Sequence, residues 1–170
     1  MRMAHCTPSP LAFAAILWHP AAMSNRKDPI RKTPDEILAD LMAGHQEALF
    51  SGPEKARKYL LNFVGQANSI PNAVKFFLFD LMAEDTFQCG DGEACCEAAA
   101  MAAGYLPVAR NEMPTAFREY RPSIRLFERG IALAIDEGEF EQALTLCDEA
   151  ITLGLGKAYK AKRASIERMT

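Results

Sequence analysis

The sequence is poor in the residues on which most catalytic and metal centres depend. Of its three histidines, His5 and His19 lie near the amino terminus, and only His45 falls in a region with helix-forming character. The five cysteines are odd in number and lack the paired C-x-x-C spacing of a zinc site. There is also no Gly-rich phosphate loop, no H-E-x-x-H and no G-x-S-x-G pattern. These absences predict a protein that is not an enzyme and that carries no metal and no cofactor.

The cysteines that are present do not form an obvious site. Cys95 and Cys96 are neighbours, so on a helix their side chains point about 100° apart and cannot readily chelate one ion together. A site that joins Cys89, Cys95 or Cys96 to the distant His45 is an alternative, but reduced thiols in a cytosolic core explain the sequence better. A catalytic thiol needs a positive neighbour, and this part of the chain is acidic. His45 itself is expected to be a boundary residue rather than a general base.

Long apolar runs and an excess of positive charge are missing too. The apolar run from residue 11 to residue 18 has eight residues, too few for a helix that spans a bilayer. A net charge of −3 and a pI near 5.7 do not suit a chain built to coat nucleic acid. With 170 residues, of which 49% are hydrophobic and 24% charged, we expect one globular domain in the cytoplasm, without a membrane span.

Residues 1–32 differ from the rest and are expected to form a flexible leader and basic tail. Three interpretations of residues 1–22 stay open: a signal-like sequence, a structural arm, or an extension upstream of a natural start at Met23. We prefer the last, because the polar residues from Ser24 on resemble an ordinary amino terminus. The basic run that follows, up to Lys32, is expected to be a solvated tail.

From residue 33 on, signals for helix starts recur. Thr33-Pro34-Asp35-Glu36 has the pattern of a capping box, and starts at residues 51–54 and 69–71 follow. The third helix, around residues 74–82, is apolar nearly all round and is expected at the centre of the core, although its aromatic residues could also line a ligand pocket. Asp91 should cap a fourth helix through Gly104. Residues 105–122 carry three prolines and predict a connector with at most one short helix, at residues 115–120.

The clearest pattern lies at residues 121–155, where small and large apolar residues recur at spacings of three and four on both sides of Gly138. Gly138 should end one helix, and a turn this short makes the next helix antiparallel. The stretch resembles a tetratricopeptide repeat, a helix–turn–helix unit of about 34 residues. The residues that carry the resemblance are Phe127, Gly130, Gly138, Phe140, Ala143 and Ala150.

The resemblance implies a stack of such hairpins with a binding groove. We therefore predict an all-α fold in which antiparallel helical hairpins form a short tetratricopeptide-like solenoid or bundle of about seven helices. Residues 33–170 would be a single domain. A basic helix at residues 157–169 would seal its end against solvent.

Charge is segregated along the chain. Residues 76–109 contain six acidic residues and no Lys or Arg, and residues 130–156 repeat this composition. Four arginines between them are the predicted partner-binding residues: Arg118, Arg121, Arg125 and Arg129. The last three recur every four residues and would share one face of a helix that begins near residue 122. Their guanidinium groups could clamp a carboxylate or phosphate, or they could simply pair with acidic residues of adjacent helices.

Two functions follow from these patterns. The preferred one is a non-catalytic interaction module or adaptor that binds a peptide or protein partner through a helical-repeat groove. The alternative is a nucleic-acid-associated accessory protein whose Arg- and Lys-rich helices contact phosphates, with an affinity that falls steeply with salt.

Overall fold

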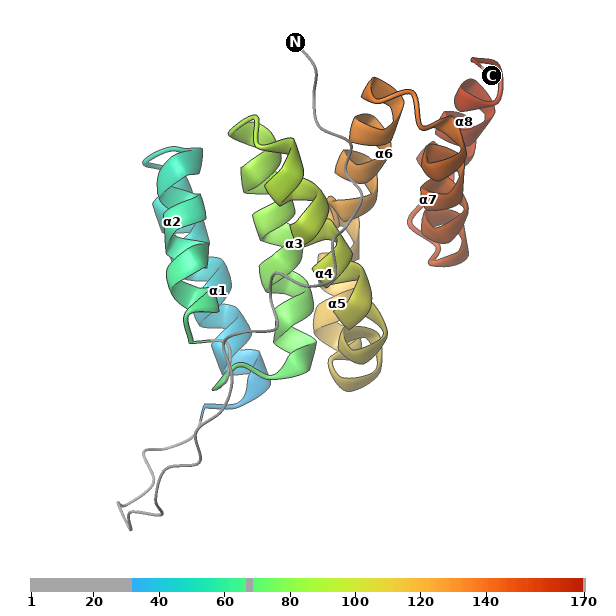
Figure 1. Ribbon diagram of the computed structural model, residues 1–170. Coiled ribbons are helices and arrows are strands. Elements are labelled where there is room, and N and C mark those ends of the chain that lie inside the picture. The colour runs from blue at the N-terminus through green and yellow to red at the C-terminus, as the bar shows by residue number, and fades with distance from the viewer. Residues whose placement is uncertain (1–31, 67–68, 170) are drawn as a thin grey trace, which may run out of the picture.

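The computed structural model describes residues 32–66 and 69–169, so the predicted leader and basic tail over residues 1–32 lies outside the described part except for Lys32. Within the described residues the chain forms eight α-helices and the short 3-10 helix η2 (Arg121–Ser123), with no strand (Figure 1). The predicted all-α class is confirmed.

Helices α1 (Pro34–Leu49) and α2 (Pro53–Val64) begin where the sequence predicts. The capping box is present: Thr33 Oγ1 accepts from the backbone N–H of Glu36 at 3.3 Å, and the Glu36 carboxylate accepts from the Thr33 N–H at 2.7 Å. The two helices approach closely at Gly44, where a Cβ atom would lie 2.3 Å from the hydroxyl oxygen of Tyr59. Gly44 thus allows the Tyr59 ring to lie against α1.

Helix α3 (Asn72–Gln88) is the centre of the core, as predicted. Phe76, Phe77 and Leu78 are completely buried, and α3 packs along α4 (Gly92–Glu112) more extensively than any other helix pair described. Phe76 and Phe77 also contact the ring of Tyr120 edge-on, with centroids 6.2 and 5.0 Å away. Phe76 and Phe77 are therefore core residues.

Helix α4 extends into the segment that the sequence predicts to be an irregular connector. The sequence places irregular chain from residue 105, but α4 continues to Glu112 with Pro107 inside it. A proline inside a helix removes one hydrogen bond. The helix persists because Leu106 and Ala109 are both buried, so its apolar face continues past the proline, which itself is exposed.

The carboxyl-terminal half follows the prediction more closely. The short helix α5 (Pro114–Tyr120) precedes η2, and α6 (Leu126–Asp136) ends before Gly138, whose φ is +77°. Then α7 (Phe140–Thr152) begins within two residues of that glycine, and α8 (Lys157–Ile166) follows. A helical hairpin of α6 and α7 is thus present within residues 121–155, and the last helix is present too.

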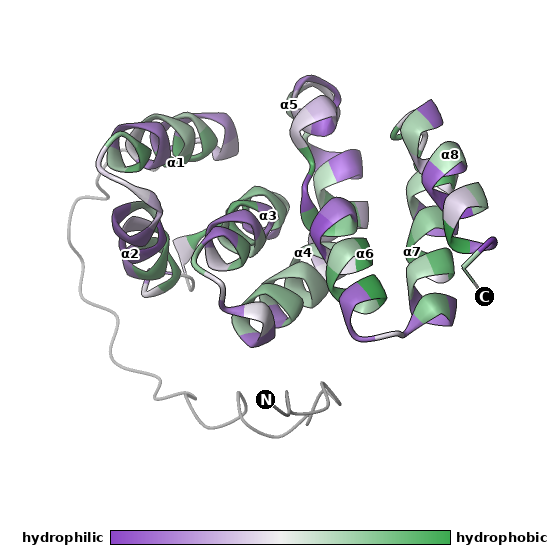
Figure 2. Cartoon of the chain, turned by 90° about the horizontal axis from the view of Figure 1, so that it is seen from above, coloured by the Kyte–Doolittle hydropathy of each residue, from purple (hydrophilic) through white to green (hydrophobic). Residues whose placement is uncertain are grey.

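The helices lie in a row, from α1 and α2 at one end to α7 and α8 at the other (Figures 1 and 2). Helix α6 contacts both α3 and α4, and it also contacts α7, so it joins the last helices of the chain to the earlier ones. One apolar cluster extends from α1 to Ala150 of α7, and a second, between α3 and α4, consists of Ala83, Cys95 and Ala98. A further small cluster at the carboxyl-terminal end consists of Ile131, Ala134, Ala143, Cys147 and Ile166. The last hairpin and α8 therefore share a small cluster of their own, and Leu146 and Tyr159 pack against both it and the larger cluster.

Candidate functional site

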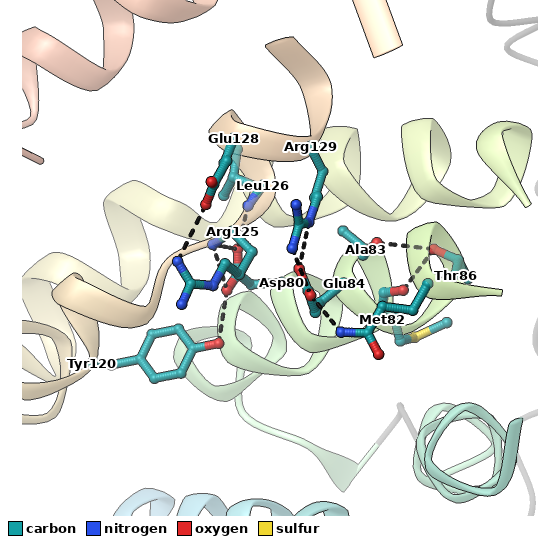
Figure 3. A network of polar contacts seen from close by, with 11 residues as sticks. Asp80, Met82, Ala83, Glu84, Thr86, Tyr120, Arg125, Leu126, Glu128 and Arg129 are labelled. Atoms are coloured by element: carbon teal, nitrogen blue, oxygen red, sulfur yellow. Dashed lines mark hydrogen bonds and ion pairs between the residues drawn. The ribbon is translucent and has the colours of Figure 1, made fainter. Parts of the chain in front are cut away.

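The start of α6 is fixed from a distance by Asp80, a buried residue of α3. Its carboxylate accepts the backbone N–H of Arg125 at 3.1 Å, that of Leu126 at 2.8 Å and the hydroxyl of Tyr120 at 2.7 Å (Figure 3). The first N–H groups of a helix have no partner within the helix, and a carboxylate there satisfies them. Asp80 therefore ties α6 and α5 to α3.

Because of this cap, the predicted row of arginines along one helix face is wrong. Helix α6 begins at Leu126 rather than near residue 122, so Arg121 lies in η2 and Arg125 at the helix cap. Only Arg129 lies within the helix. The three arginines do not form one row along a helix face, because Asp80 captures the backbone N–H groups of Arg125 and Leu126.

Arg129 is used inside the fold. Its guanidinium donates two hydrogen bonds to the carboxylate of Glu84 on α3, at 2.6 and 2.8 Å, and lies 4.6 Å from the ring centre of Phe87. Burial alone would raise the pKa of Glu84, but hydrogen bonds from Arg129 and Gln88 lower it overall. Pairing with an adjacent helix, the alternative that the sequence left open, is what Arg129 does (Figure 3).

Arg121 and Arg125 lie elsewhere, on a groove of about 250 Å³ between the start of α6 and α8. Lys162 of α8 adds a third cation, and Glu128 is the one acidic side chain of the lining. We call this the basic groove. Its other lining residues are Pro122, Ile124, Leu155, Ala158 and Tyr159.

The floor of the basic groove is apolar. Ile124 is buried, and Leu155 and Tyr159 are half-buried. Burial raises the pKa of the Tyr159 hydroxyl, and the nearby Glu128 carboxylate adds to this. The neutral phenol remains a hydrogen-bond donor at neutral pH. Arg125 is held by Glu128 through a 3.2 Å contact between exposed side chains. Cations at the rim above an apolar floor suit an anionic group attached to an apolar body.

Arg118, the fourth predicted residue, is exposed on α5 and does not line the basic groove. Conversely, the predicted partner-binding residues did not include Tyr159 or Lys162, although Lys162 belongs to the basic helix that the nucleic-acid alternative invoked. Part of this grouping could be predicted from the sequence, because Ala158 and Lys162 are four residues apart on α8 and share a helix face. What the sequence did not indicate is that this face turns toward η2.

His45 differs from its predicted place at a boundary. It is buried, and its Nε2 lies 2.9 Å from Oδ2 of Asp85, so the pair joins α1 to α3. Cys95 is also buried, and burial raises the pKa of its thiol to about 11, so it is a thiol at neutral pH rather than a nucleophilic thiolate. In the part of the chain that the structure describes, no three His, Cys, Asp or Glu side chains gather as metal ligands would.

None of the helices in the described ranges combines the length and the apolar character needed to cross a bilayer. Comparisons of the chain with protein-family models, with curated proteins and with solved structures find no match.

Proposed function

We propose that the chain is a non-catalytic interaction module, built from tetratricopeptide-like hairpins, whose basic groove binds an acidic segment of a peptide or protein partner. The observation that carries the proposal is the convergence of Arg121, Arg125 and Lys162 from separate elements on one apolar-floored groove. Residues far apart in the sequence thus supply one patch of positive charge.

The chemistry of the lining favours carboxylates that lie close to apolar side chains. Arg121 is exposed, and its planar guanidinium can donate two parallel hydrogen bonds to one carboxylate. Lys162 adds a point charge from the opposite wall, and the half-buried Tyr159 and Leu155 can cover an aliphatic side chain. A volume of about 250 Å³ accommodates one or two side chains of a peptide rather than a large cofactor.

The proposal is tested with a short fluorescent peptide that alternates glutamate with leucine, by fluorescence anisotropy. The Arg121→Gln/Lys162→Gln variant removes two cations of the groove, and we expect it to weaken binding about tenfold or more. Its matched control is Arg110→Gln/Arg118→Gln, which removes two exposed cations outside the groove. Equal affinities of the two variants would mean that only net charge matters, and the groove would not be the site.

A second binding experiment tests the alternative, a nucleic-acid-associated function. The alternative is supported by α8, which carries several basic residues beside the groove. A single-stranded oligonucleotide should then bind with an affinity that falls steeply as salt is raised. If the oligonucleotide binds more tightly than the acidic peptide at physiological salt, the protein-binding proposal is wrong.

A further inference from the structure

A second groove, of about 490 Å³, lies between α4 and α7 over α6, and it shares no lining residue with the basic groove. Its floor includes Phe127, which is 2% exposed, and Leu106, which is 6% exposed. The half-buried Leu153 closes the floor at the end of α7. We call it the acidic groove, because Asp148 and Glu149 line its rim.

The α4 wall is low and offers a hydrogen-bond acceptor. Ala103 and Pro107, one helical turn apart, are both exposed and both line the groove. Pro107 has no N–H, so the carbonyl of Ala103 lacks the donor that a helix normally provides four residues later. The short side chain of Ala103 and the exposed ring of Pro107 keep this wall low.

The α7 wall also offers acceptors. Asp148 and Glu149 line it, and no Lys or Arg does. Thr145 and Thr152 line it as well, but their hydroxyls already donate to carbonyls of their own helix, at 3.0 and 2.9 Å. Asp148 is paired with Arg163 of α8 at 2.6 Å, which leaves Glu149 as the acid without an ion pair to a described residue. The groove is therefore apolar at its floor and negative at its rim.

We infer that the acidic groove is a second binding surface, for a short amphipathic helix whose apolar face is flanked by Lys or Arg. The volume lies within the range of binding pockets, and two helices with a gap between them accept a ridge of side chains spaced four residues apart. We expect a cationic occupant, because Glu149 has no ion pair to a described residue and no Lys or Arg lines the groove. With its two grooves of opposite charge, the chain can hold two partners at once.

The test uses the full chain and a fluorescent helical peptide with two leucines four residues apart and flanking lysines. Ala103→Trp fills the groove from an exposed helix position, and Glu149→Lys reverses its charge. Ala100→Trp and Glu97→Lys are the matched controls, because both residues are exposed on α4 and neither lines the groove. Circular dichroism verifies that each variant is folded.

We expect saturable binding that Ala103→Trp and Glu149→Lys each weaken about tenfold, while the controls bind as wild type does. A peptide with alanine in place of the leucines should bind far more weakly. The Arg121→Gln/Lys162→Gln variant should bind the basic peptide normally, so this inference can fail while the proposed function holds. Binding that survives the leucine replacement or Ala103→Trp would reveal mere attraction to an acidic surface, and self-association that Ala103→Trp abolishes would identify a second copy as the occupant. Either result overturns the inference.

Discussion

Asp80 is one buried carboxylate on which the start of α6 depends, and its protonation should be visible in stability. Burial raises its pKa from 3.8 to about 6, although Tyr120 and two backbone N–H groups favour the charged form. Between these two values the folded state keeps a proton that the unfolded state has released. The contribution of Asp80 to the free energy of unfolding is therefore complete below about pH 4. It decreases as pH rises from there through the folded pKa of about 6, by up to about 3 kcal/mol in all.

The measurement is the difference in unfolding free energy between wild type and Asp80→Asn, from urea titrations between about pH 3 and 7, a range that covers both transitions. We expect wild type to lose its advantage as pH rises. Glu84→Gln is the control with the opposite sign. Because the pKa of Glu84 is lowered in the fold, its contribution is present above the unfolded value of 4.5 and is lost as pH falls. Parallel slopes for the two variants would contradict this assignment.

Gly44 and Gly104 both lie within helices and should respond in opposite ways to alanine. Replacing a helix-interior glycine by alanine normally stabilises by about 1 kcal/mol. Gly104 has open space around it, so Gly104→Ala should show this gain. At Gly44 the new Cβ would overlap the ring of Tyr59, which must then move and release its 3.1 Å hydrogen bond to the carbonyl of Asp40.

We therefore expect Gly44→Ala to be neutral or destabilising in thermal unfolding. In a Tyr59→Ala background the overlap disappears, and the same substitution should become stabilising by about 1 kcal/mol. If Gly44→Ala stabilises the wild-type chain as much as Gly104→Ala does, the close approach of α1 and α2 at this point is not as the structure has it.

Helix α4 shows how a single residue can mislead sequence reasoning about an element. Pro107 lies inside the helix, where the Ala103 carbonyl lacks its usual donor. Pro107→Ala restores that donor and removes the ring, so we expect the free energy of unfolding to rise by about 1–3 kcal/mol. Urea denaturation with unchanged slope is the check. A loss of stability would mean that the proline ring contributes packing that its exposure does not reveal.

The predictable and the unpredictable parts of this fold differ in their physical origin. Thr33 and Gly138 act on neighbours a few residues away, so caps and turns could be predicted from the sequence. The end of α4 depends on burial against α3, and the start of α6 on Asp80, 45 residues upstream. Such long-range contacts leave no local signal.

The candidate site was predictable in part for the same reason. Arg121 and Arg125 were identified by charge, but their neighbour Lys162 comes from another helix. Arg129 has the same charge and spacing and is nevertheless committed to Glu84. No pattern of residue types distinguishes these arginines, because the distinction depends on which acid of α3 faces which turn of α6.

The small carboxyl-terminal cluster has a consequence for the molecule as a whole. Ile166 of α8 is buried in the small carboxyl-terminal cluster, together with Ile131 and Cys147. The larger cluster, around Phe76 and Phe77, does not include it. Because few buried residues hold α8 in place, we expect this end of the chain to open without global unfolding.

Ile166→Ala should therefore act locally. Removing a buried isoleucine side chain costs about 2–5 kcal/mol, which should accelerate native-state hydrogen exchange in α7 and α8 and leave α3 unchanged. Because one wall of the basic groove belongs to α8, the variant should also bind the acidic peptide more weakly, in proportion to the fraction of opened ends. Exchange that accelerates equally in α3 would show that the chain unfolds as one unit. The basic groove would then be no more easily lost than the core itself.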